Sequence, residues 1–164
     1  MELIELNDDN YEALSRLRLL PYQEAYVKNF NKCVEYKKEN PFLRIFGIKD
    51  NDTYIGLTAF ARWDSNLNIP ENERWCWFDE FFFDYKYQHK GYSHEAIRLI
   101  LAKMKELYNP PFVVLSVRND NLAAKSLYED LGFIYTGEIY DEALDQVLKR
   151  EIKETDELIM RKYY

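Results

Sequence analysis

Two adjacent carboxylic acids in an aromatic stretch are the residues best suited to chemistry in this 164-residue chain. They are Asp79 and Glu80, and the string Phe81-Phe82-Phe83 follows them directly. A carboxylate can attract a cationic amine and take its proton, directly or through water. An alkylamine needs such a base, because at a pKa of about 10.4 fewer than about one molecule in a thousand is neutral at pH 7. The competing interpretation is one exposed acid and one acid in a salt bridge.

A short polar turn, Gln88-His89-Lys90-Gly91-Tyr92-Ser93, follows the aromatic string. Apolar residues then recur at helical spacing over 92–107, so we expect a strand, a tight turn and a helix. Unpaired backbone N–H groups at a helix start carry partial positive charge, which suits a phosphate. The turn matches neither the G-x-x-x-x-G-K-[ST] pattern of a Walker loop nor the G-x-G-x-x-G glycines of a dinucleotide fingerprint. One glycine at such a turn is, by itself, equally compatible with an ordinary connection.

The elements that must position these residues follow from periodicity and turn residues. Strands are expected at 2–6, 43–48, 54–61, 75–84, 112–117, 133–140 and 157–163. Helices are expected at 11–20, 22–39, 92–107 and 122–131, the second with a buried stripe of Ala25, Tyr26, Phe30, Cys33 and Val34. Residues 49–52 form a hairpin turn, and Gly132 follows the last helix as its C′ residue. The charged segment 141–155 is left open between a loop and a short helix.

This order of elements indicates an α/β fold with a mixed, mostly antiparallel central sheet and helices on both faces. The strand, turn, helix and strand over 75–117 place two strands parallel by a right-handed crossover. Neither a repeat nor a linker divides the chain, so we expect one domain over residues 1–164.

Charge and composition exclude several classes of function. The net charge of −7 argues against a nucleic-acid partner and mildly favours a cationic ligand, although solubility alone also accounts for it. We expect a cytoplasmic protein that does not enter a membrane, because neither a membrane-spanning run nor a signal peptide is present. Cys33 and Cys76 form no Cys-x-x-Cys motif, and His89 and His94 are too few for a metal cluster. We therefore expect neither a metal nor an acyl-enzyme.

Two segments resemble motifs of the GNAT superfamily of acyl-CoA-dependent N-acetyltransferases, and the resemblance covers nearly the whole chain. The turn at 88–93 is similar to the Q/R-x-x-G-x-G/A pyrophosphate loop of that family: Gln88 and Gly91 match, and Ser93 replaces the usual Gly or Ala. The segment from Asn119 through Tyr128 to Gly132-Phe133 resembles the family's N-x-x-A and Y-x-x-x-G-F elements.

The resemblance implies a role for each residue of these motifs. Acetyl-CoA would be held by the loop residues Gln88, His89, Lys90, Gly91, Tyr92 and Ser93, by Asn119 and Lys125, and by the backbone of Phe81 and Phe83. Tyr128 would also lie at the cofactor sulfur and protonate the leaving thiolate, although a tyrosine on an amphipathic helix is more often a core residue. An N–H group near Phe81 would donate to the oxyanion.

A third segment, Phe78-Asp79-Glu80-Phe81-Phe82-Phe83, is similar to the L-E-D-F-F-V string of the diamine and polyamine acetyltransferase branch, with the two acids swapped. The resemblance implies that Asp79 is the base and Glu80 the amine contact. Adjacent strand residues point to opposite faces, so both acids reach one cleft only if the strand is bulged or splayed. Glu71 and Glu73 would extend an acidic rim or belong to a solvated loop.

The expected function is direct transfer of an acetyl group from acetyl-CoA to a primary amine of a small polycation such as spermidine or spermine. A homodimer is expected by analogy with the family. Three alternatives stay open. The first is acetylation of an amino acid, an aminoglycoside-like amine or a protein amine. The second is a non-catalytic acyl-CoA-binding module, and the third is an interaction domain that has lost the cofactor.

Overall fold

The structure is a computed structural model that describes residues 1–62, 70 and 73–164. Glu71, and all of the expected polar loop at 65–72 except Pro70, lie outside the described residues. Glu73 is described and exposed. The choice between an acidic rim and a solvated loop for Glu71 and Glu73 therefore stays open.

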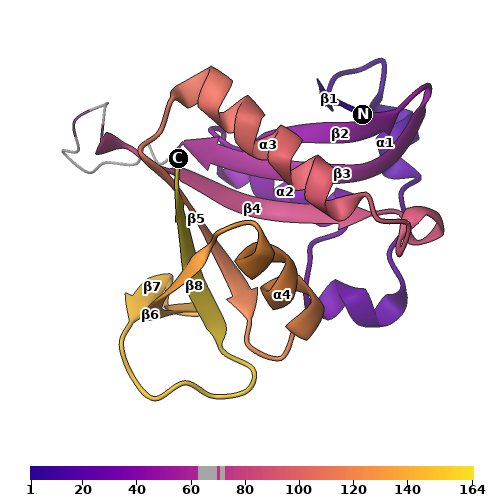
Figure 1. The fold of residues 1–164 in the computed structure, drawn as a ribbon. Helices are drawn as coiled ribbons and strands as arrows, with labels where there is room; N and C mark the ends of the chain where they lie inside the picture. The colour runs from indigo at the N-terminus through magenta and orange to yellow at the C-terminus, as the bar shows by residue number, and fades with distance from the viewer. Residues whose placement is uncertain (63–69, 71–72) are drawn as a thin grey trace.

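A mixed sheet forms the centre of the part of the chain that the structure describes (Figure 1). Its eight strands lie in the order β1-β2-β3-β4-β5-β8-β6-β7, and the one parallel pair among them is β4 with β5. The strands are β1 (Glu2–Glu5), β2 (Arg44–Asp50), β3 (Thr53–Arg62), β4 (Cys76–Phe83), β5 (Phe112–Arg118), β6 (Ile134–Asp141), β7 (Gln146–Leu148) and β8 (Glu157–Tyr163). The last strand, β8, lies between β5 and β6 and joins them in one sheet.

Helices cover both faces of the sheet, as the sequence predicts (Figure 1). They are α1 (Tyr11–Ser15), α2 (Phe30–Glu39), α3 (Ser93–Tyr108) and α4 (Leu122–Asp130), with 3₁₀ turns η1 (Pro21–Ala25) and η3 (Tyr85–Tyr87). The apolar stripe of α3 packs on one face, and α1 and α2 pack on the other. None of the described helices is long and apolar enough to cross a membrane.

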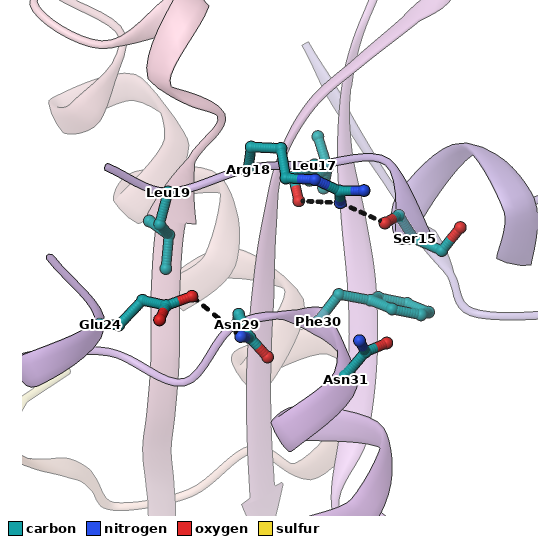
Figure 2. Close-up of a pocket in the computed structure, with 8 residues that line it drawn as sticks. All are labelled: Ser15, Leu17, Arg18, Leu19, Glu24, Asn29, Phe30 and Asn31. Carbon is teal, nitrogen blue, oxygen red and sulfur yellow. Dashed lines mark hydrogen bonds between the residues drawn. The ribbon is translucent and has the colours of Figure 1, made fainter. Parts of the chain in front are cut away.

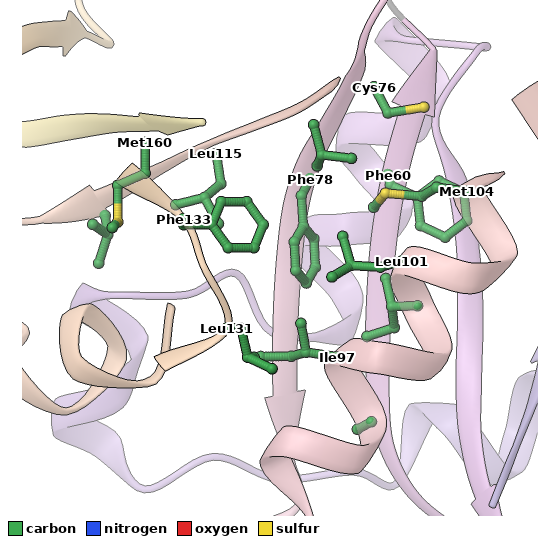
Figure 3. Packing of buried hydrophobic residues seen from close by; sticks show 14 of the residues in the cluster. Phe60, Cys76, Phe78, Ile97, Leu101, Met104, Leu115, Leu131, Phe133 and Met160 are labelled. Atoms are coloured by element: carbon green, nitrogen blue, oxygen red, sulfur yellow. The ribbon is translucent and has the colours of Figure 1, made fainter. Parts of the chain in front are cut away.

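The larger core lies under α3 (Figure 3). Phe78 of β4 lies between Ile97 and Leu101 of α3 on one side and Leu115 and Phe133 on the other. All five side chains are at least nine-tenths buried, and burial of each such side chain contributes about 1.5–3 kcal/mol. This core therefore holds α3 and its leading turn rigidly against β4.

The predicted helix at 22–39 is wrong as one continuous element. The chain forms η1, then breaks, and α2 begins only at Phe30. Asn29 caps α2 by accepting a hydrogen bond from the backbone N–H of Lys32 at 3.1 Å, which is a role that favours asparagine. Ala25 and Tyr26, predicted to be buried, are exposed, whereas Phe30 and Cys33 are buried as predicted.

Two further segments differ from the prediction. The first helix ends at Ser15 rather than at residue 20, because the chain after it is bound elsewhere: the Arg18 N–H donates to Asp84 Oδ2 at 2.8 Å, and the Arg18 carbonyl accepts from Tyr85 N–H. The open segment 141–155 contains the short strand β7, which pairs with β6 and was not predicted.

Strands β4 and β5 begin together and then separate (Figure 1). Within the described residues their pairing consists of Cys76 with Val113 and Trp77 with Val114. From Phe78 to Phe83, β4 is paired with β3 only, so this stretch has one edge that no neighbouring strand occupies.

Candidate active site

A β-bulge in β4 brings the two acids to the same face of the sheet. Ala59 of β3 is opposite Glu80 and Phe60 is opposite Phe78, so Asp79 is the extra residue. The extra residue shifts the alternation by one position. Phe78 and Phe81 consequently both pack in the core under α3, and both acids point to the opposite face. The bulge that their convergence requires is present.

Thr58 on the neighbouring strand β3 stabilises the bulge with a hydrogen bond. Its hydroxyl is fully buried and donates to the Glu80 carbonyl at 2.9 Å. A bulge removes a residue from the regular hydrogen-bond ladder, so a buried carbonyl needs another donor. Thr58 supplies that donor.

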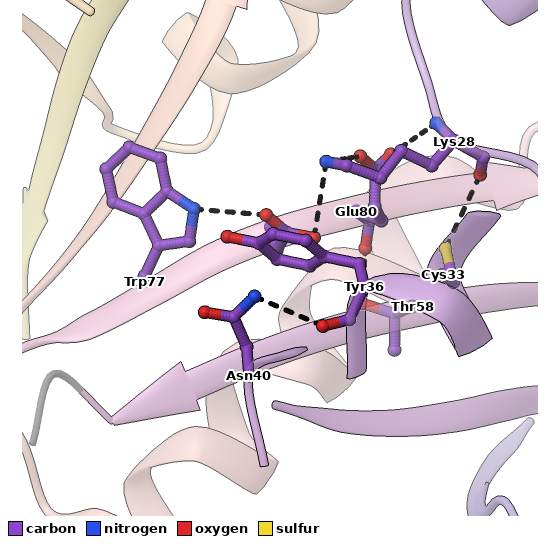
Figure 4. Close-up of polar contacts among 8 residues, drawn as sticks. Lys28, Cys33, Tyr36, Asn40, Thr58, Trp77 and Glu80 are labelled. Carbon is purple, nitrogen blue, oxygen red and sulfur yellow. Dashed lines mark hydrogen bonds and ion pairs between the residues drawn. The ribbon is translucent and has the colours of Figure 1, made fainter. Parts of the chain in front are cut away.

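An ammonium group of the protein itself lies against the acid pair (Figure 4). Lys28 Nζ is 2.8 Å from Glu80 Oε1 and 3.6 Å from Asp79 Oδ2. The backbone N–H of Lys28 also donates to Glu80 Oε2 at 3.1 Å. The ring of Tyr36 on α2 lies under the ammonium, with 4.9 Å from Nζ to the ring centroid. Two carboxylates and an aromatic ring thus form a binding site for a primary alkylammonium.

The two carboxyl groups titrate above their ordinary range. Burial raises the pKa of both Asp79 and Glu80, and the positive charge of Lys28 opposes that rise. Burial acts to lower the pKa of Lys28, but the two carboxylates outweigh it and raise that pKa above its usual value. The site therefore combines a lysine whose charged form is favoured with two carboxyl groups whose charged forms are disfavoured by burial.

Asp79 is only partly satisfied by hydrogen bonds. Its Oδ1 accepts from the indole N–H of Trp77 at 3.3 Å. Its Oδ2 is buried and accepts no hydrogen bond within the described structure, and the side chain as a whole is 6% exposed. Glu80, in contrast, has donors on both oxygens.

Further acidic groups surround the pair. Tyr140 of β6 packs its ring 5.7 Å from Trp77, which places the β6–β7 turn beside the acids. Glu142 in that turn contributes to the raised pKa of both Asp79 and Glu157 of β8. Glu142 therefore adds negative charge beside the acid pair, which favours a cationic ligand.

The two thiols do not take part in this chemistry. Burial, followed by the charges of Glu80 and Asp79, raises the pKa of Cys33, and burial raises the pKa of Cys76 to about 12. Both thiols are therefore protonated at neutral pH and are poor nucleophiles. Among the described residues, moreover, no three His, Cys, Asp or Glu side chains are grouped so as to hold a metal.

The turn before α3 has the backbone expected of an anion-binding loop. His89 and Gly91 have φ of +58° and +81°, and a Cβ added at Gly91 would meet nothing within 4 Å. Tyr92 at the N-cap makes no side-chain cap, so the first N–H groups of α3 keep their capacity to bind a ligand. Lys90, Ser93 and these two residues with positive φ thus lie in one turn whose backbone suits an anion.

The side chain of Gln88 is engaged inside the protein. It exchanges two hydrogen bonds, of 2.7 and 2.9 Å, with the amide of Gln23 in η1, and it donates to the Phe83 carbonyl at 3.0 Å. Asp84 stabilises the same turn, because its Oδ1 accepts a hydrogen bond from the Lys86 N–H at 3.0 Å. A contact of Gln88 with acetyl-CoA would therefore come from its backbone.

Asn119 and Lys125 contact each other at the end of β5. Lys125 Nζ donates to Asn119 Oδ1 at 2.8 Å, and the Asn119 amide donates to the Lys153 carbonyl at 3.2 Å. The last residue of α4, Asp130, lies 3.4 Å from His94 in the first turn of α3. The two motifs of the sequence, 88–93 and 119–133, are thus brought together.

Tyr128 lies on α4 and packs edge-on against Phe78 and Phe133, with centroid distances of 6.2 and 5.6 Å. Burial, with a contribution from Glu80, raises its pKa, so the hydroxyl keeps its proton at neutral pH. Among the described residues this hydroxyl has no hydrogen-bond partner. It is therefore available to donate a proton to a leaving group.

A separate hollow of about 230 Å³ lies between the α1–η1 connection and the start of α2 (Figure 2). It is lined by Ser15, Leu17, Arg18, Leu19, Glu24, Asn29, Phe30 and Asn31, and thus by neither acid. Its charged groups are bound within the protein: Arg18 donates to the carbonyls of Ser15 and Leu17, and Glu24 accepts from Asn29. The acid pair therefore lies outside this hollow.

Sequence reasoning missed Lys28, Tyr36 and Glu142. Lys28 was placed inside a helix, yet Asn29 beside it is a strong N-cap residue and could have marked a break. Tyr36 and Glu142 had no such local signal, because each reaches the site only through packing of distant segments.

Known proteins resemble this chain over most of its length. The spermine/spermidine N(1)-acetyltransferase of Bacillus subtilis is 28% identical over 134 residues, which are 82% of this chain and 88% of the relative. A spermidine N-acetyltransferase from Vibrio cholerae, solved with CoA and spermine, has a TM-score of 0.71 at 20% identity and covers 98% of this chain and 94% of its own. A dodecameric form of a Vibrio cholerae spermidine N-acetyltransferase has a TM-score of 0.65 at 21% identity, covering 98% and 92%. The two solved structures share the fold.

Residues 4–133 match the acetyltransferase (GNAT) family. The matched range includes the bulged strand, the turn before α3 and the Asn119–Tyr128 segment. The chain therefore belongs to the acetyltransferase (GNAT) family and is an acetyl-CoA-dependent N-acetyltransferase.

Proposed function

We propose that this enzyme acetylates a primary amine of a small polycation such as spermidine or spermine. The observation that carries the proposal is the buried acid pair with an alkylammonium, that of Lys28, already against it. A lysine side chain ends in the same group as a polyamine, so the site has the chemistry to bind one. The polyamine acceptors of the relatives support the same substrate class.

The proposed mechanism is direct transfer. Acetyl-CoA supplies the activated acetyl group. A carboxylate of the acid pair takes a proton from the acceptor ammonium, and the neutral nitrogen then bonds to the acetyl carbon as the carbon–sulfur bond breaks. Tyr128 gives a proton to the departing sulfur, and the nitrogen releases a second proton that balances it. Phe81 N–H, on the edge of β4 that β5 leaves unpaired, stabilises the oxyanion.

The residues proposed to hold acetyl-CoA are those of the turn at 88–93, the edge of β4 at Phe81 and Phe83, and the pair Asn119 and Lys125. The unpaired edge of β4 and the uncapped start of α3 support this assignment. We also propose a cytoplasmic protein in one domain, which assembles into an oligomer of at least two chains, by analogy with the oligomeric relative.

The test is release of CoA from acetyl-CoA across a panel of spermidine, spermine, putrescine, an aminoglycoside, amino acids and a lysine peptide. We expect saturable turnover with spermidine and spermine and almost none with amino acids, because the acids repel a free carboxylate. Turnover with none of the polyamines would refute the proposed acceptor. Binding of acetyl-CoA without turnover of any amine would instead indicate a binding module.

A further inference from the structure

We propose that Lys28 is a positioning residue that holds Glu80 as its fixed partner and leaves Asp79 as the carboxylate that binds and deprotonates the acceptor. The inference rests on the proposed acetylation of amines at this site. It deepens that proposal by assigning Glu80 to Lys28 rather than to the amine, and by adding a residue from outside the family motifs.

Lys28 is held in place by its backbone as well as by its ammonium. Its N–H and its Nζ donate to the two different oxygens of Glu80, at 3.1 and 2.8 Å. Its carbonyl accepts from Cys33 Sγ at 3.5 Å, and the next residue, Asn29, caps α2. Lys28 is therefore part of the framework around the site, unlike a surface lysine that swings into solvent.

Asp79 has a carboxylate oxygen that an N–H group of the acceptor would satisfy. Within the described part of the chain its Oδ2 is buried without a hydrogen bond, and Lys28 Nζ at 3.6 Å is too far to donate one. A buried carboxylate oxygen without a donor is costly, so a ligand N–H at this position stabilises it. An acceptor ammonium beside Lys28 would supply that N–H and would place its nitrogen where Asp79 can take a proton.

The charge of Lys28 also keeps a second proton off the pair. Among the described residues, the groups that face Asp79 are Glu80 and Trp77 on β4, Lys28 before α2, Cys33 and Tyr36 on α2, and Glu142 in the β6–β7 turn. Of the charged groups among them, Lys28 alone is positive. Removing its charge must therefore raise the pKa of Asp79, and the base form then requires a higher pH.

The first experiment follows Asp79 in the free enzyme without any acceptor. The indole N–H resonance of Trp77 in ¹⁵N-labelled protein, assigned with Trp77→Phe, reports protonation of Asp79 because the two are hydrogen bonded. We expect Lys28→Met to move the titration midpoint up by about one pH unit or more. Lys28→Arg, which keeps the charge, and Lys32→Met, which removes an exposed lysine one turn along, should leave it in place.

A second variant covers the case in which Lys28→Met does not fold. Glu80→Gln removes a negative neighbour and frees the Lys28 ammonium for Asp79, so the same resonance should titrate at a lower pH. An unchanged midpoint in a folded Lys28→Met or Glu80→Gln protein would overturn the inference, because Lys28 would then only anchor the chain.

The activity arm separates this inference from the proposed function. With an acceptor that the wild type acetylates, the acid limb of kcat/KM should move in Lys28→Met by the same amount as the resonance. A lower KM for the acceptor with an unmoved acid limb would overturn the inference by making Lys28 a competitor of the substrate. If the wild type acetylates no polyamine, the proposed function fails, and the resonance still tests the roles of Lys28 and Asp79.

Discussion

The two faces of β4 carry opposite chemistry within eight residues. The face under α3 is aromatic, with Phe78, Phe81 and Phe83 in contact with one another and with Tyr128 and Tyr92. The face toward α2 has Asp79 and Glu80 with the ammonium of Lys28. One face stabilises the fold by burying apolar area, whereas burial of the charges on the other costs free energy that only close pairing offsets.

The difference teaches that a single extra residue can separate stability from chemistry. Without the bulge, Glu80 would project into the aromatic core, where an unpaired carboxylate is very costly. With the bulge, the core keeps its aromatic side chains and the two acids share one environment. Bulges are common next to active sites, where they change the direction in which a side chain points. The comparison predicts that substitutions on the acidic face change activity, and that those on the aromatic face change stability.

The largest expected effect is that of Asp79→Asn, which removes the proposed base but keeps an acceptor for the Trp77 N–H. We expect kcat/KM to fall by about 10²–10⁴-fold, because that is the usual contribution of a general base. The thermal midpoint should change little, since a neutral amide avoids the cost of burying charge. Steady-state kinetics and calorimetry measure the two. Asp52→Asn, in an exposed turn, is the control. Wild-type activity in Asp79→Asn would exclude Asp79 as the base.

Phe78→Ala should have the largest effect on the aromatic face. Phe78 is 4% exposed and contacts Phe81 and Tyr128, so we expect the free energy of unfolding to fall by about 3–5 kcal/mol. Urea denaturation measures the loss. Phe42→Ala, at a side chain that is 63% exposed, should cost less than about 0.5 kcal/mol. Equal losses in the two variants would contradict the assignment of this face to stability.

Tyr128→Phe tests the side chain of the aromatic face to which we assign chemistry. The ring stays in the core and only the hydroxyl is lost, so stability should be unchanged. We expect kcat to fall by about 10²-fold, the lower end of the usual contribution of a general acid, with little change in KM for the amine, because the proton for the leaving thiolate is lost. Tyr135→Phe, at an exposed tyrosine bonded to Glu129, is the matched control. An unaffected kcat would assign Tyr128 to packing alone.

The smallest expected effect is that of Thr58→Val, which keeps the shape of the side chain but removes the donor to the Glu80 carbonyl. Leaving that buried carbonyl unpaired should cost about 1–3 kcal/mol of stability. Activity should also fall, because the bulge that aligns the acids is loosened. Denaturation and kinetics on the same samples test this, with Thr53→Val at an exposed strand start as the control. Lost stability with intact activity would show that the bulge does not depend on Thr58.

Much of the fold was predictable from the sequence, because its signals are local. The period of α3, the hairpin turn between β2 and β3, and Gly132 with φ of +88° after α4 all depend on neighbours a few residues away. The prediction of one helix over 22–39 was wrong although its apolar spacing is helical. The Lys28 N–H instead bonds to Glu80, which is distant in sequence, and this hydrogen bond competes with the helix. Strand β7 was missed because its three residues form a strand only by pairing with β6.

The candidate site divides in the same way. The sequence by itself determined that two acids lie in an aromatic strand, that a polar turn with Gly91 begins a helix, and that Asn119 and Tyr128 have the spacing of a known family. Only the tertiary structure decided that a bulge turns both acids to one face, and that Lys28 lies between them. The physical reason is distance along the chain: Lys28 and Glu80 are 52 residues apart, and only packing of α2 against β4 brings their charges to 2.8 Å.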